Sequence, residues 1–270
     1  MAKECWRLIK HAPASGAWNM EVDVALMQSA TQGGPPTLRF YAWQPAALSL
    51  GYNQKEAVVD KAACKAAGVD VVRRPTGGRA VLHANEVTYA IVLPAEHPIA
   101  QLGIVASYRE LSRGFVTGFQ RLGLPSELAQ PERDSLANKK VTGITGAGAA
   151  CFDAPSWYEL AVGGRKVVGS AQVRRRGALL QHGSIPLTLD GLALYQLLAF
   201  NRNEAREAAA RMFNAKAAGL CDVAGRQITA EQVMAALVEG ISQELGVQFE
   251  QGDLSSQELA SAMQCQEAQL

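Results

Sequence analysis

The chain has 270 residues, of which 48 % are hydrophobic and 19 % charged, a composition that excludes disorder as the main state and suits one fairly large domain or two small ones. Its 26 Lys and Arg nearly balance 25 Asp and Glu, so the net charge of +1 provides no global field for binding nucleic acid or an anionic membrane. The longest apolar runs, such as residues 90–93, are far shorter than the roughly 20 residues of a membrane span.

Cysteine and histidine spacing gives little support to a metal site. The five cysteines occur singly, without a CxxC pair, which predicts free thiols in place of a disulfide framework or a structural zinc site. They are Cys5, Cys64, Cys151, Cys221 and Cys265. The four histidines show no close ligand spacing, so we expect no bound metal. The N-terminal segment lacks the apolar stretch of a secretion signal, and we expect a cytoplasmic protein.

The first part of the chain alternates between helical and extended patterns. Residues 14–30 carry apolar side chains at helical spacing behind Ser15, a possible N-cap, and predict an opening helix. An Ala-rich helix is predicted near residues 59–67. Short strands are predicted at 38–43, 46–51, 69–73, 79–83 and 86–93.

Further along, a helix and a hairpin stand out. Apolar residues recur every three or four positions over 105–122, which predicts an amphipathic helix. The pair Gly163-Gly164 predicts a tight hairpin, because such turns need positive φ at both central residues. Its register places Ala161 opposite Lys166, and we expect the second strand to continue to residue 173. A third strand is expected at 178–186.

The last third reads as helical. Asp190 caps one predicted helix, and Thr229 with Gln232 forms the capping box of another, which Gly246 ends. No repeat or low-complexity linker divides the chain. We therefore expect a single α/β domain over residues 1–250, with its core at about 37–187, and a helical tail at 251–270.

Three stretches combine glycine with charge or a thiol: residues 73–83, 146–156 and 166–172. In the first, flexible backbone flanked by arginines can offer N–H donors and positive charge to a carbonyl or a phosphate. A plain strand-turn-strand with solvated arginines is the alternative. Residues 143–148 have the order GxxGxG, which is not the dinucleotide-binding order, and no GxxxxGK[ST] phosphate loop occurs.

Cys151 differs from the other cysteines because it follows a run of small residues and precedes a turn, a setting that suits an accessible nucleophilic thiol. A buried, inert cysteine is the alternative. Lys166 could lower the pKa of a nearby thiol, since an ammonium group favours the thiolate. An ordinary cross-strand ion pair between Lys166 and Glu159 would explain the lysine equally well.

Taken in order, four segments of the chain resemble the cysteine-dependent octanoyl-[acyl-carrier-protein]:protein N-octanoyltransferases of the biotin/lipoate-protein ligase superfamily. They are Gly-Gly-Arg-Ala-Val-Leu-His at 77–83, Ala-Cys-Phe-Asp-Ala-Pro-Ser at 150–156, Lys-Val-Val-Gly-Ser-Ala-Gln at 166–172 and Leu-Leu-Gln-His-Gly-Ser-Ile at 179–185. The resemblance covers about residues 37–187. It implies an α/β (α+β) fold with a mixed, largely antiparallel sheet of the class II synthetase-like type, flanking helices and a helical C-terminal appendage.

The same resemblance implies roles for individual residues. Cys151 would be the acyl-thioester nucleophile, and Lys166 would be the cation that lowers its pKa. The residues expected to line the ligand site are Arg74, Gly77, Gly78, Arg79, His83 and Gly169. The ATP-using ligases of the superfamily usually carry a third glycine where this chain has Arg79, and they lack the segment around Cys151. This difference argues against acyl-adenylate chemistry, and we expect no cofactor.

The implied reaction moves an octanoyl group from octanoyl-acyl carrier protein to a lysine of a lipoyl domain, with the glycine-cleavage H protein as the closest match, in the first step of endogenous lipoate biosynthesis. Other readings stay open: an ATP-dependent lipoate-protein ligase, an amidotransferase that moves octanoyl or lipoyl groups between lipoyl domains, and a non-catalytic acyl-binding module. The resemblance implies a monomer. Arg73, Arg74, Arg79 and the cluster 174–176 could form a local basic surface for an acidic carrier protein, although a solvated turn explains the cluster too.

Overall fold

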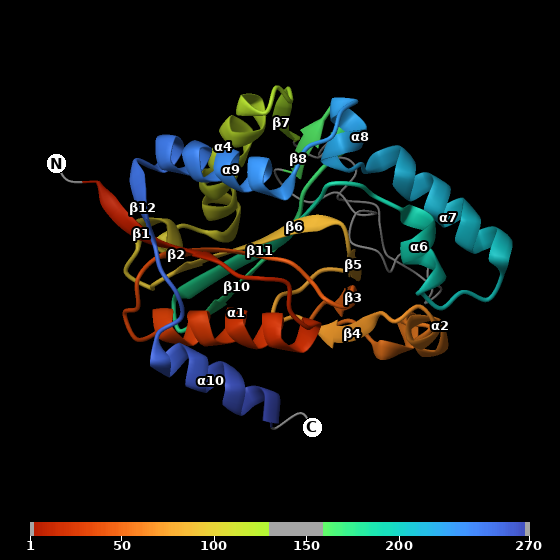
Figure 1. Ribbon diagram of the computed structural model, residues 1–270, viewed down its shortest axis with the longest axis horizontal. Coiled ribbons are helices and arrows are strands. Elements are labelled where there is room, and N and C mark those ends of the chain that lie inside the picture. Colours follow the sequence, from red (N-terminus) through yellow and green to blue (C-terminus); the bar gives the residue numbers. More distant parts are fainter. Residues whose placement is uncertain (1–2, 130–158, 268–270) are drawn as a thin grey trace.

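A six-stranded mixed sheet forms the centre of the molecule (Figure 1). The computed structural model describes residues 3–129 and 159–267. The strands of this sheet are β1 Glu4–Lys10, β2 Thr37–Tyr41, β6 Glu86–Leu93, β10 Gly169–Arg175, β11 Ala178–Pro186 and β12 Val247–Gln251. They lie in the order β10-β11-β6-β2-β1-β12, with β1 parallel to β2 and β12 and the other pairs antiparallel. The expected mixed, largely antiparallel sheet with flanking helices is therefore confirmed.

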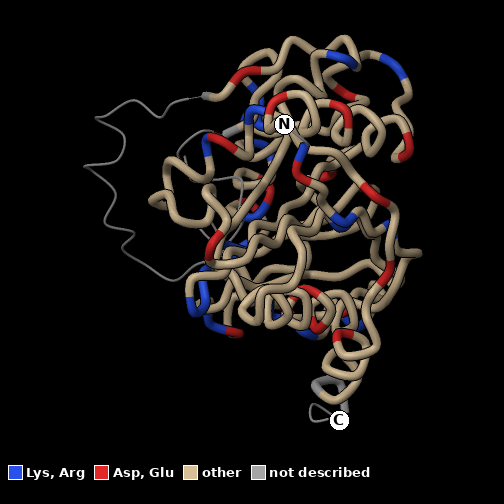
Figure 2. The backbone as a smooth tube through the Cα atoms, turned by 90° about the vertical axis from the view of Figure 1, so that its left-hand side faces the viewer, with Lys and Arg blue, Asp and Glu red and all other residues tan. Residues whose placement is uncertain are grey.

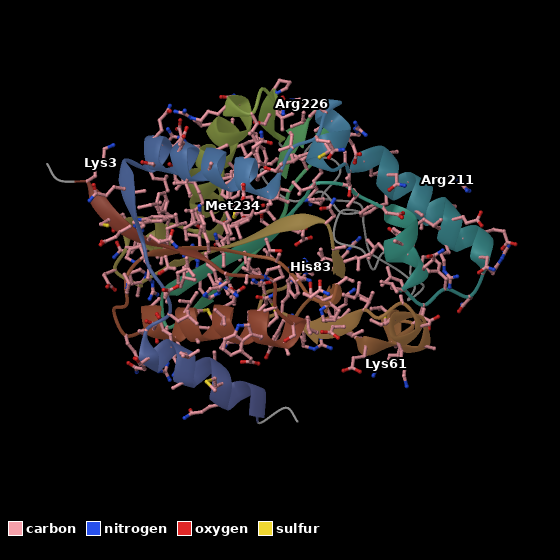
Figure 3. All side chains as sticks on the ribbon, viewed as in Figure 1. Lys3, Lys61, His83, Arg211, Arg226 and Met234 are labelled. Atoms are coloured by element: carbon pink, nitrogen blue, oxygen red, sulfur yellow. The ribbon has the colours of Figure 1, made fainter. Side chains whose placement is uncertain are left out.

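Helices cover both faces of the central sheet. Figure 1 shows α1 Gly16–Ala30 and α10 Ser256–Glu267 below the sheet, and α4 Ile104–Arg121 and α9 Ala230–Leu245 above it. Every residue of β6 is buried as a result, which explains why its sequence is nearly continuously apolar. Figure 3 shows side chains filling the space between the layers, with Met234 of α9 pointing into the upper one.

The predicted helix ends are confirmed by their caps. The Ser15 side chain accepts a hydrogen bond from the Trp18 amide at the start of α1, and Thr229 and Gln232 form the capping box of α9, which ends at Gly246 in the left-handed conformation. α4 and α9 approach closely at glycines: a Cβ on Gly240 would lie 2.3 Å from the Gly114 carbonyl oxygen. Small residues at this crossing allow the two helices to pack backbone against backbone.

Two three-stranded sheets flank the central one. The first has the order β4-β3-β5, and the second β7-β8-β9. Their bounds are β3 Ala47–Leu50, β4 Asp70–Arg73, β5 Val81–His83, β7 Ser126–Ala129, β8 Glu159–Val162 and β9 Arg165–Lys166. The remaining helices are η1 Glu56–Val58, α2 Lys61–Ala66, α3 Pro98–Gln101, α6 Gly191–Gln196, α7 Asn203–Lys216 and α8 Leu220–Ala224.

The hairpin around Gly163 and Gly164 forms with the predicted register, in which Ala161 lies opposite Lys166. Both glycines have positive φ, as the turn requires. The expected continuous strand to residue 173 is wrong, because β9 ends at Lys166 and β10 begins at Gly169 in the central sheet. The two valines between them are fully buried as the chain passes from one sheet to the other.

Charges of both signs are interspersed along the helices and loops (Figure 2), in keeping with the nearly neutral total. Within the described ranges, no helix combines the length and apolar character needed to cross a membrane.

Candidate active site

A cavity that opens to solvent lies between α1, the strands β2, β3, β5 and β6, and the Gly169 end of the β10–β11 pair. Its apolar lining comes from Met20, Tyr41, Trp43, Val81 and Ala171. Polar side chains also face it, namely Ser49, Arg74, His83, Thr88, Ser170, His182 and Ser184. Three of the residues expected from the sequence, Arg74, His83 and Gly169, thus meet at one cavity although they are up to 95 positions apart.

The β10–β11 pair reaches the cavity through backbone that only small residues allow. Gly169 pairs with Ser184, and Ser170 pairs with Gly183. A Cβ on Gly183 would lie 2.6 Å from the Gly169 carbonyl oxygen, so a larger residue would force the strands apart. Ser170 is held by a 2.7 Å hydrogen bond to the Tyr89 hydroxyl.

The loop 74–79, which carries the diglycine, is folded around the Arg74 guanidinium. Nη1 donates to the Ser49 carbonyl (3.0 Å) and hydroxyl (3.1 Å), and Nη2 donates to the carbonyls of Gly77 and Arg79, both at 2.8 Å. Arg74 is buried, whereas Gly77 and Gly78 are exposed and Arg79 is half-buried. The arginine therefore fixes the backbone of the loop from beneath.

Close packing restricts the loop further. Gly78 has a φ of +95°, which favours glycine, and a Cβ on Gly51 would lie 2.1 Å from the Gly78 carbonyl oxygen. The Tyr52 amide donates to the Thr76 carbonyl at 2.8 Å. The diglycine loop thus rests directly on the end of β3.

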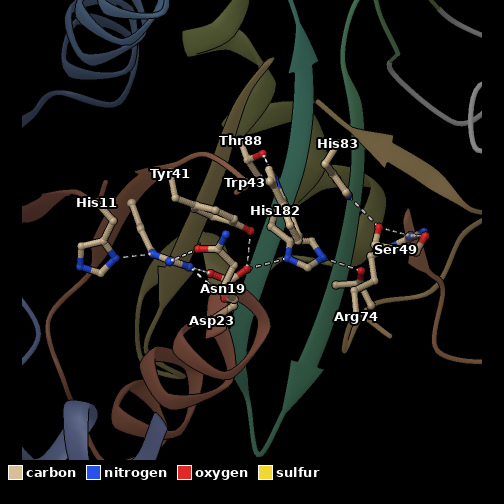
Figure 4. Close-up of polar contacts among 12 residues, drawn as sticks. His11, Asn19, Asp23, Tyr41, Trp43, Ser49, Arg74, His83, Thr88 and His182 are labelled. Atoms are coloured by element: carbon tan, nitrogen blue, oxygen red, sulfur yellow. Dashed lines mark hydrogen bonds and ion pairs between the residues drawn. The ribbon is translucent and has the colours of Figure 1, made fainter. Parts of the chain in front are cut away.

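A buried carboxylate, Asp23 of α1, lies at the centre of one polar chain (Figure 4). Its Oδ1 accepts from Arg39 Nη1 at 2.7 Å, and its Oδ2 accepts from the Tyr41 hydroxyl and from His182 Nδ1, both at 2.8 Å. Burial alone would raise the pKa of Asp23, but the His182 hydrogen bond and the Arg39 charge outweigh it and keep the pKa below its usual value. Asp23 is therefore ionised at neutral pH.

The Arg39 side chain lies wholly inside the protein and makes its hydrogen bonds there. It has no exposed surface, and it also donates from Nε to His11 Nδ1 at 3.0 Å and from Nη2 to Asn19 Oδ1 at 2.8 Å. Burial, with the Arg39 charge, lowers the pKa of His11 to about 4, so the His11 ring is neutral and able to accept.

His182 continues the chain to the diglycine loop. Its Nε2 lies 2.6 Å from the Thr76 hydroxyl. Burial lowers the pKa of His182 despite the opposing effect of Asp23, with Arg74 and His83 adding to the lowering. Figure 4 shows the ring between Asp23 on one side and Arg74 on the other.

A second chain of the same kind begins at Glu86. Its Oε1 accepts from His83 Nδ1 at 2.8 Å and from the Thr88 hydroxyl, and Oε2 accepts from the Ser184 hydroxyl at 2.6 Å. Burial would raise the pKa of Glu86, but the charge and hydrogen bond of His83 and the hydroxyl donors hold it below its usual value. His83 Nε2 then meets the Ser49 hydroxyl at 2.7 Å, and Ser49 in turn accepts from Arg74.

Trp43 completes the wall around His83. The two rings are stacked, with centroids 4.1 Å apart and an interplanar angle of 14°, and Trp43 Nε1 donates to Thr88 at 2.7 Å. Figure 3 places His83 deep inside the molecule, while Lys61 and Arg211 lie at its periphery.

The proposed catalytic pair is only partly described. Lys166 is buried, 7 % exposed, at the end of β9, and its carbonyl accepts from the Ala218 amide at 3.0 Å. Cys151 lies outside the described residues, as do the glycines of residues 143–148. The side chain of Glu159 is also outside them, so neither the thiol–lysine contact nor the alternative ion pair with Lys166 is tested.

Among the cysteines that the structure describes in full, none is placed for chemistry at this cavity. Cys5 is exposed on β1, and Cys64 is the buried residue of α2, where burial raises the pKa of its thiol. Cys221 is half-buried, and its sulfur accepts from the Ile228 amide at 3.3 Å. The described ranges contain no group of three or more His, Cys, Asp or Glu positioned to hold a metal ion.

The arginines expected to form one basic surface lie in different places and differ in their contacts. Arg174 donates to the carbonyls of Ala100 and Leu102 and to the Ser107 hydroxyl, so it anchors α3 and the start of α4. Arg73 Nη1 likewise donates to three backbone carbonyls, at Gly51, Tyr52 and Gln54. Arg175 and Arg176 are exposed, but they lie at the far end of β10 from Gly169, about 20 Å along a strand of this length.

Sequence reasoning missed several residues of the two polar chains. They are Asp23, Arg39, Tyr41, Ser49, Thr76, Glu86 and Thr88. One signal was available, because a charged residue flanked by apolar ones, as in Val22-Asp23-Val24 or Leu38-Arg39-Phe40, is unusual in a buried helix or strand. That signal shows that a buried partner exists, although it does not identify the partner.

Comparison with known proteins identifies the family. Residues 15–242 match the family described as lipoyl protein ligase A/B catalytic domain. The octanoyltransferase LipM of Kyrpidia tusciae is 44 % identical over 263 residues, which cover 97 % of this chain and 94 % of the relative. The octanoyltransferase LipM of Bacillus subtilis is 41 % identical over 265 residues, covering 96 % and 93 %.

Solved structures share the fold. A bi-partite lipoate protein ligase from Thermoplasma acidophilum superposes with a TM-score of 0.78 at 22 % identity, covering 99 % of this chain and 92 % of that chain. A lipoate-protein ligase A bound with ATP gives a TM-score of 0.75, also at 22 % identity, covering 98 % and 95 %. The chain therefore belongs to the family of lipoyl protein ligase A/B catalytic domains and, within that family, to the octanoyltransferases.

Proposed function

We propose that this protein transfers an octanoyl group from octanoyl-acyl carrier protein to a lysine of a lipoyl domain, with the glycine-cleavage H protein as the preferred acceptor, and that it does so as a cytoplasmic monomer. The observation that carries this proposal is the identity of 44 % to an octanoyltransferase over 97 % of the chain. The cavity supports it, because an octanoyl chain needs a largely apolar site next to a few polar groups.

The acyl chain would lie in the cavity beside the diglycine loop. Six methylenes, each contributing about 0.8 kcal/mol when buried, would add roughly 5 kcal/mol to binding. Trp43 and Tyr41 supply most of the aromatic surface of the lining, while Met20 adds a flexible side chain that adapts to chain length.

The chemistry proceeds in two transfers. The Cys151 thiolate attacks the thioester carbonyl of the donor, the carrier protein's thiolate leaves, and the octanoyl group becomes a thioester on Cys151. The neutral ε-amine of the acceptor lysine then attacks that thioester, the new amide forms, and the Cys151 thiolate is released with loss of the amine's proton. Amide formation from a thioester is strongly downhill, so the reaction needs no ATP.

The burial of Lys166 is compatible with an electrostatic role. A buried ammonium close to a thiol favours the thiolate more strongly than one in water. If Lys166 acts in this way, Lys166→Ala should lower acylation at neutral pH and recover part of it at higher pH.

Intact-mass measurement tests the proposal directly. The protein is incubated with octanoyl-acyl carrier protein in the absence of ATP, and we expect one octanoyl adduct that neutral hydroxylamine removes. Cys151→Ala should form no adduct, whereas Cys5→Ser, which changes an exposed thiol on β1, should form it normally. Lack of an adduct, with activity only when ATP is added, would contradict the transferase and support the ligase.

The acceptor and donor are tested separately. Octanoylated enzyme is offered H protein and other lipoyl domains, and the fastest transfer should go to H protein. Replacing the donor by an octanoylated lipoyl domain distinguishes the amidotransferase, because only that enzyme would accept an amide-linked octanoyl group as donor. Binding without any turnover would indicate an acyl-binding module.

A further inference from the structure

Two separate hydrogen-bond chains support the buried side of the loop 74–79. Each chain joins a carboxylate, an imidazole and a hydroxyl. In one chain Asp23 and His182 end on Thr76 of the loop. In the other, Glu86 and His83 end on Ser49, which contacts Arg74. The acyl-binding role of the loop rests on the function proposed above, and the role of the first chain goes beyond that function.

The direction of the hydrogen bonds in the first chain follows from its chemistry. Asp23 is ionised and can only accept, so His182 Nδ1 carries a hydrogen. The neutral ring then has a lone pair on Nε2, which accepts from the Thr76 hydroxyl at 2.6 Å. Both ring nitrogens are thereby hydrogen-bonded to groups of the protein itself.

Thr76, the last residue of the Asp23–His182–Thr76 hydrogen-bond chain, directly precedes the diglycine, so its position affects the diglycine backbone. Thr76 has no exposed surface, yet the next two residues, Gly77 and Gly78, are exposed, and Arg74, which lines the cavity, donates to the Gly77 carbonyl. Glycines are conformationally permissive, so their backbone depends on how the neighbouring residues are fixed. With Gly51 packed against the Gly78 carbonyl, a displacement of Thr76 cannot be absorbed without moving the diglycine.

We infer that His182, oriented by Asp23, is a positioning residue that fixes Thr76 and thereby the diglycine backbone, which is bonded to Arg74 of the cavity lining. It acts through the loop.

A matched pair at Thr76 gives the first test. Thr76→Val keeps the branched shape and replaces the hydroxyl that reaches His182 by a methyl group, whereas Thr76→Ser keeps the hydroxyl. We expect Thr76→Val to lower kcat/KM for octanoyl transfer by about 10²-fold, mostly through kcat, since a displacement of about 1 Å at a reacting group costs that much. Thr76→Ser should restore most of the rate.

Hydrogen exchange tests the loop independently of activity. In Thr76→Val, the amides of Tyr52 and Arg74, which donate to the carbonyls of Thr76 and Leu50, should exchange about fivefold to tenfold faster, as expected for loss of one hydrogen bond, while those of α4 stay unchanged. If the wild-type protein shows no octanoyl transfer, the proposed function fails, but this exchange difference still decides the positioning role.

His182→Asn completes a double-mutant cycle. Its amide can still donate to Asp23 from near the Nδ1 position but does not reach Thr76, so it should reproduce the effects of Thr76→Val. The double variant should be no worse than either single variant, because both break the same link. Additive losses would overturn the inference, as would equal rates and equal loop exchange in Thr76→Val and Thr76→Ser. If His182→Asn does not fold, the Thr76 pair alone decides.

Discussion

The C-terminal helix is tied to the first strand by a buried ion pair whose strength can be measured through pH. Arg7 of β1 binds Glu258 of α10 with two hydrogen bonds, of 2.8 Å from Nη1 and 2.7 Å from Nη2. The Ser255 amide donates to the same carboxylate at 2.7 Å, and the Glu258 side chain is only 2 % exposed. Burial alone would raise the pKa of Glu258, but the Arg7 and Ser255 hydrogen bonds outweigh it and lower the pKa from 4.5 to about 2.

This lowering of the pKa predicts a contribution to stability of about 3 kcal/mol at neutral pH. Because the pKa is lower in the folded than in the unfolded state, the contribution is complete above about pH 5 and is lost as the pH falls toward about 2. Glu258→Gln keeps the shape of the side chain and removes its charge. We expect this variant to be less stable than wild type by about 3 kcal/mol at pH 7, with a difference about 1 kcal/mol smaller at about pH 3.5.

Urea unfolding of both proteins, followed by circular dichroism between pH 7 and pH 3.5, measures this difference. Glu204→Gln is the control, because the Glu204 side chain is 79 % exposed, and it should leave the stability unchanged within about 0.5 kcal/mol. A wild-type–variant difference that stays constant with pH would show that Glu258 stabilises by packing alone, and the linkage argument would be refuted.

Three further substitutions test the site and the turn between β8 and β9. Gly51→Ala places a Cβ 2.1 Å from the Gly78 carbonyl oxygen, so it should lower the free energy of unfolding by about 1–3 kcal/mol and reduce octanoyl transfer by more than the stability loss explains. Glu86→Leu leaves the hydroxyl and imidazole donors without their acceptor and should cost about 3 kcal/mol or more in urea unfolding, with Glu86→Gln milder. Gly163→Ala should lower the free energy of unfolding by about 1–2 kcal/mol, since its φ is +56°, while Gly103→Ala, equally open but with φ of −61°, should cost less, through the weaker N-cap preference of Ala alone.

Local signals in the sequence predicted many of the helices and strands. The caps at Ser15, Asp190 and Thr229 fixed helix starts, because capping depends on residues three positions apart. The glycine pair at 163 and 164 fixed a hairpin register for the same reason. By contrast, β1 and β12 were missed, because their pairing joins residues about 240 positions apart and leaves no local trace.

The break between β9 and β10 shows where a local argument fails. Residues 165–173 are compatible with one extended strand, and nothing in their pattern says that Lys166 ends one sheet and Gly169 begins another. The partner strands decide: β9 pairs with β8, while β10 pairs with β11. Tertiary pairing therefore overrode a reasonable strand prediction.

For the site, the resemblance identified Arg74, His83 and Gly169, which the structure brings to one cavity, but it did not identify what holds them. The supporting carboxylates Asp23 and Glu86 lie in separate elements, α1 and β6, and their partners are known only once the chain is folded.

The hydrogen-bond donors around Asp23 and Glu86 explain how the protein tolerates two buried carboxylates. An ionised carboxylate inside a protein is unfavourable unless several donors surround it, and each of these two accepts at least three hydrogen bonds. Such a fully bonded carboxylate fixes the tautomer and orientation of the histidine beside it, which an apolar residue of the same size cannot do. The buried charges therefore serve to define the geometry of the diglycine loop, and replacing them by apolar side chains should loosen that loop even where overall stability is retained.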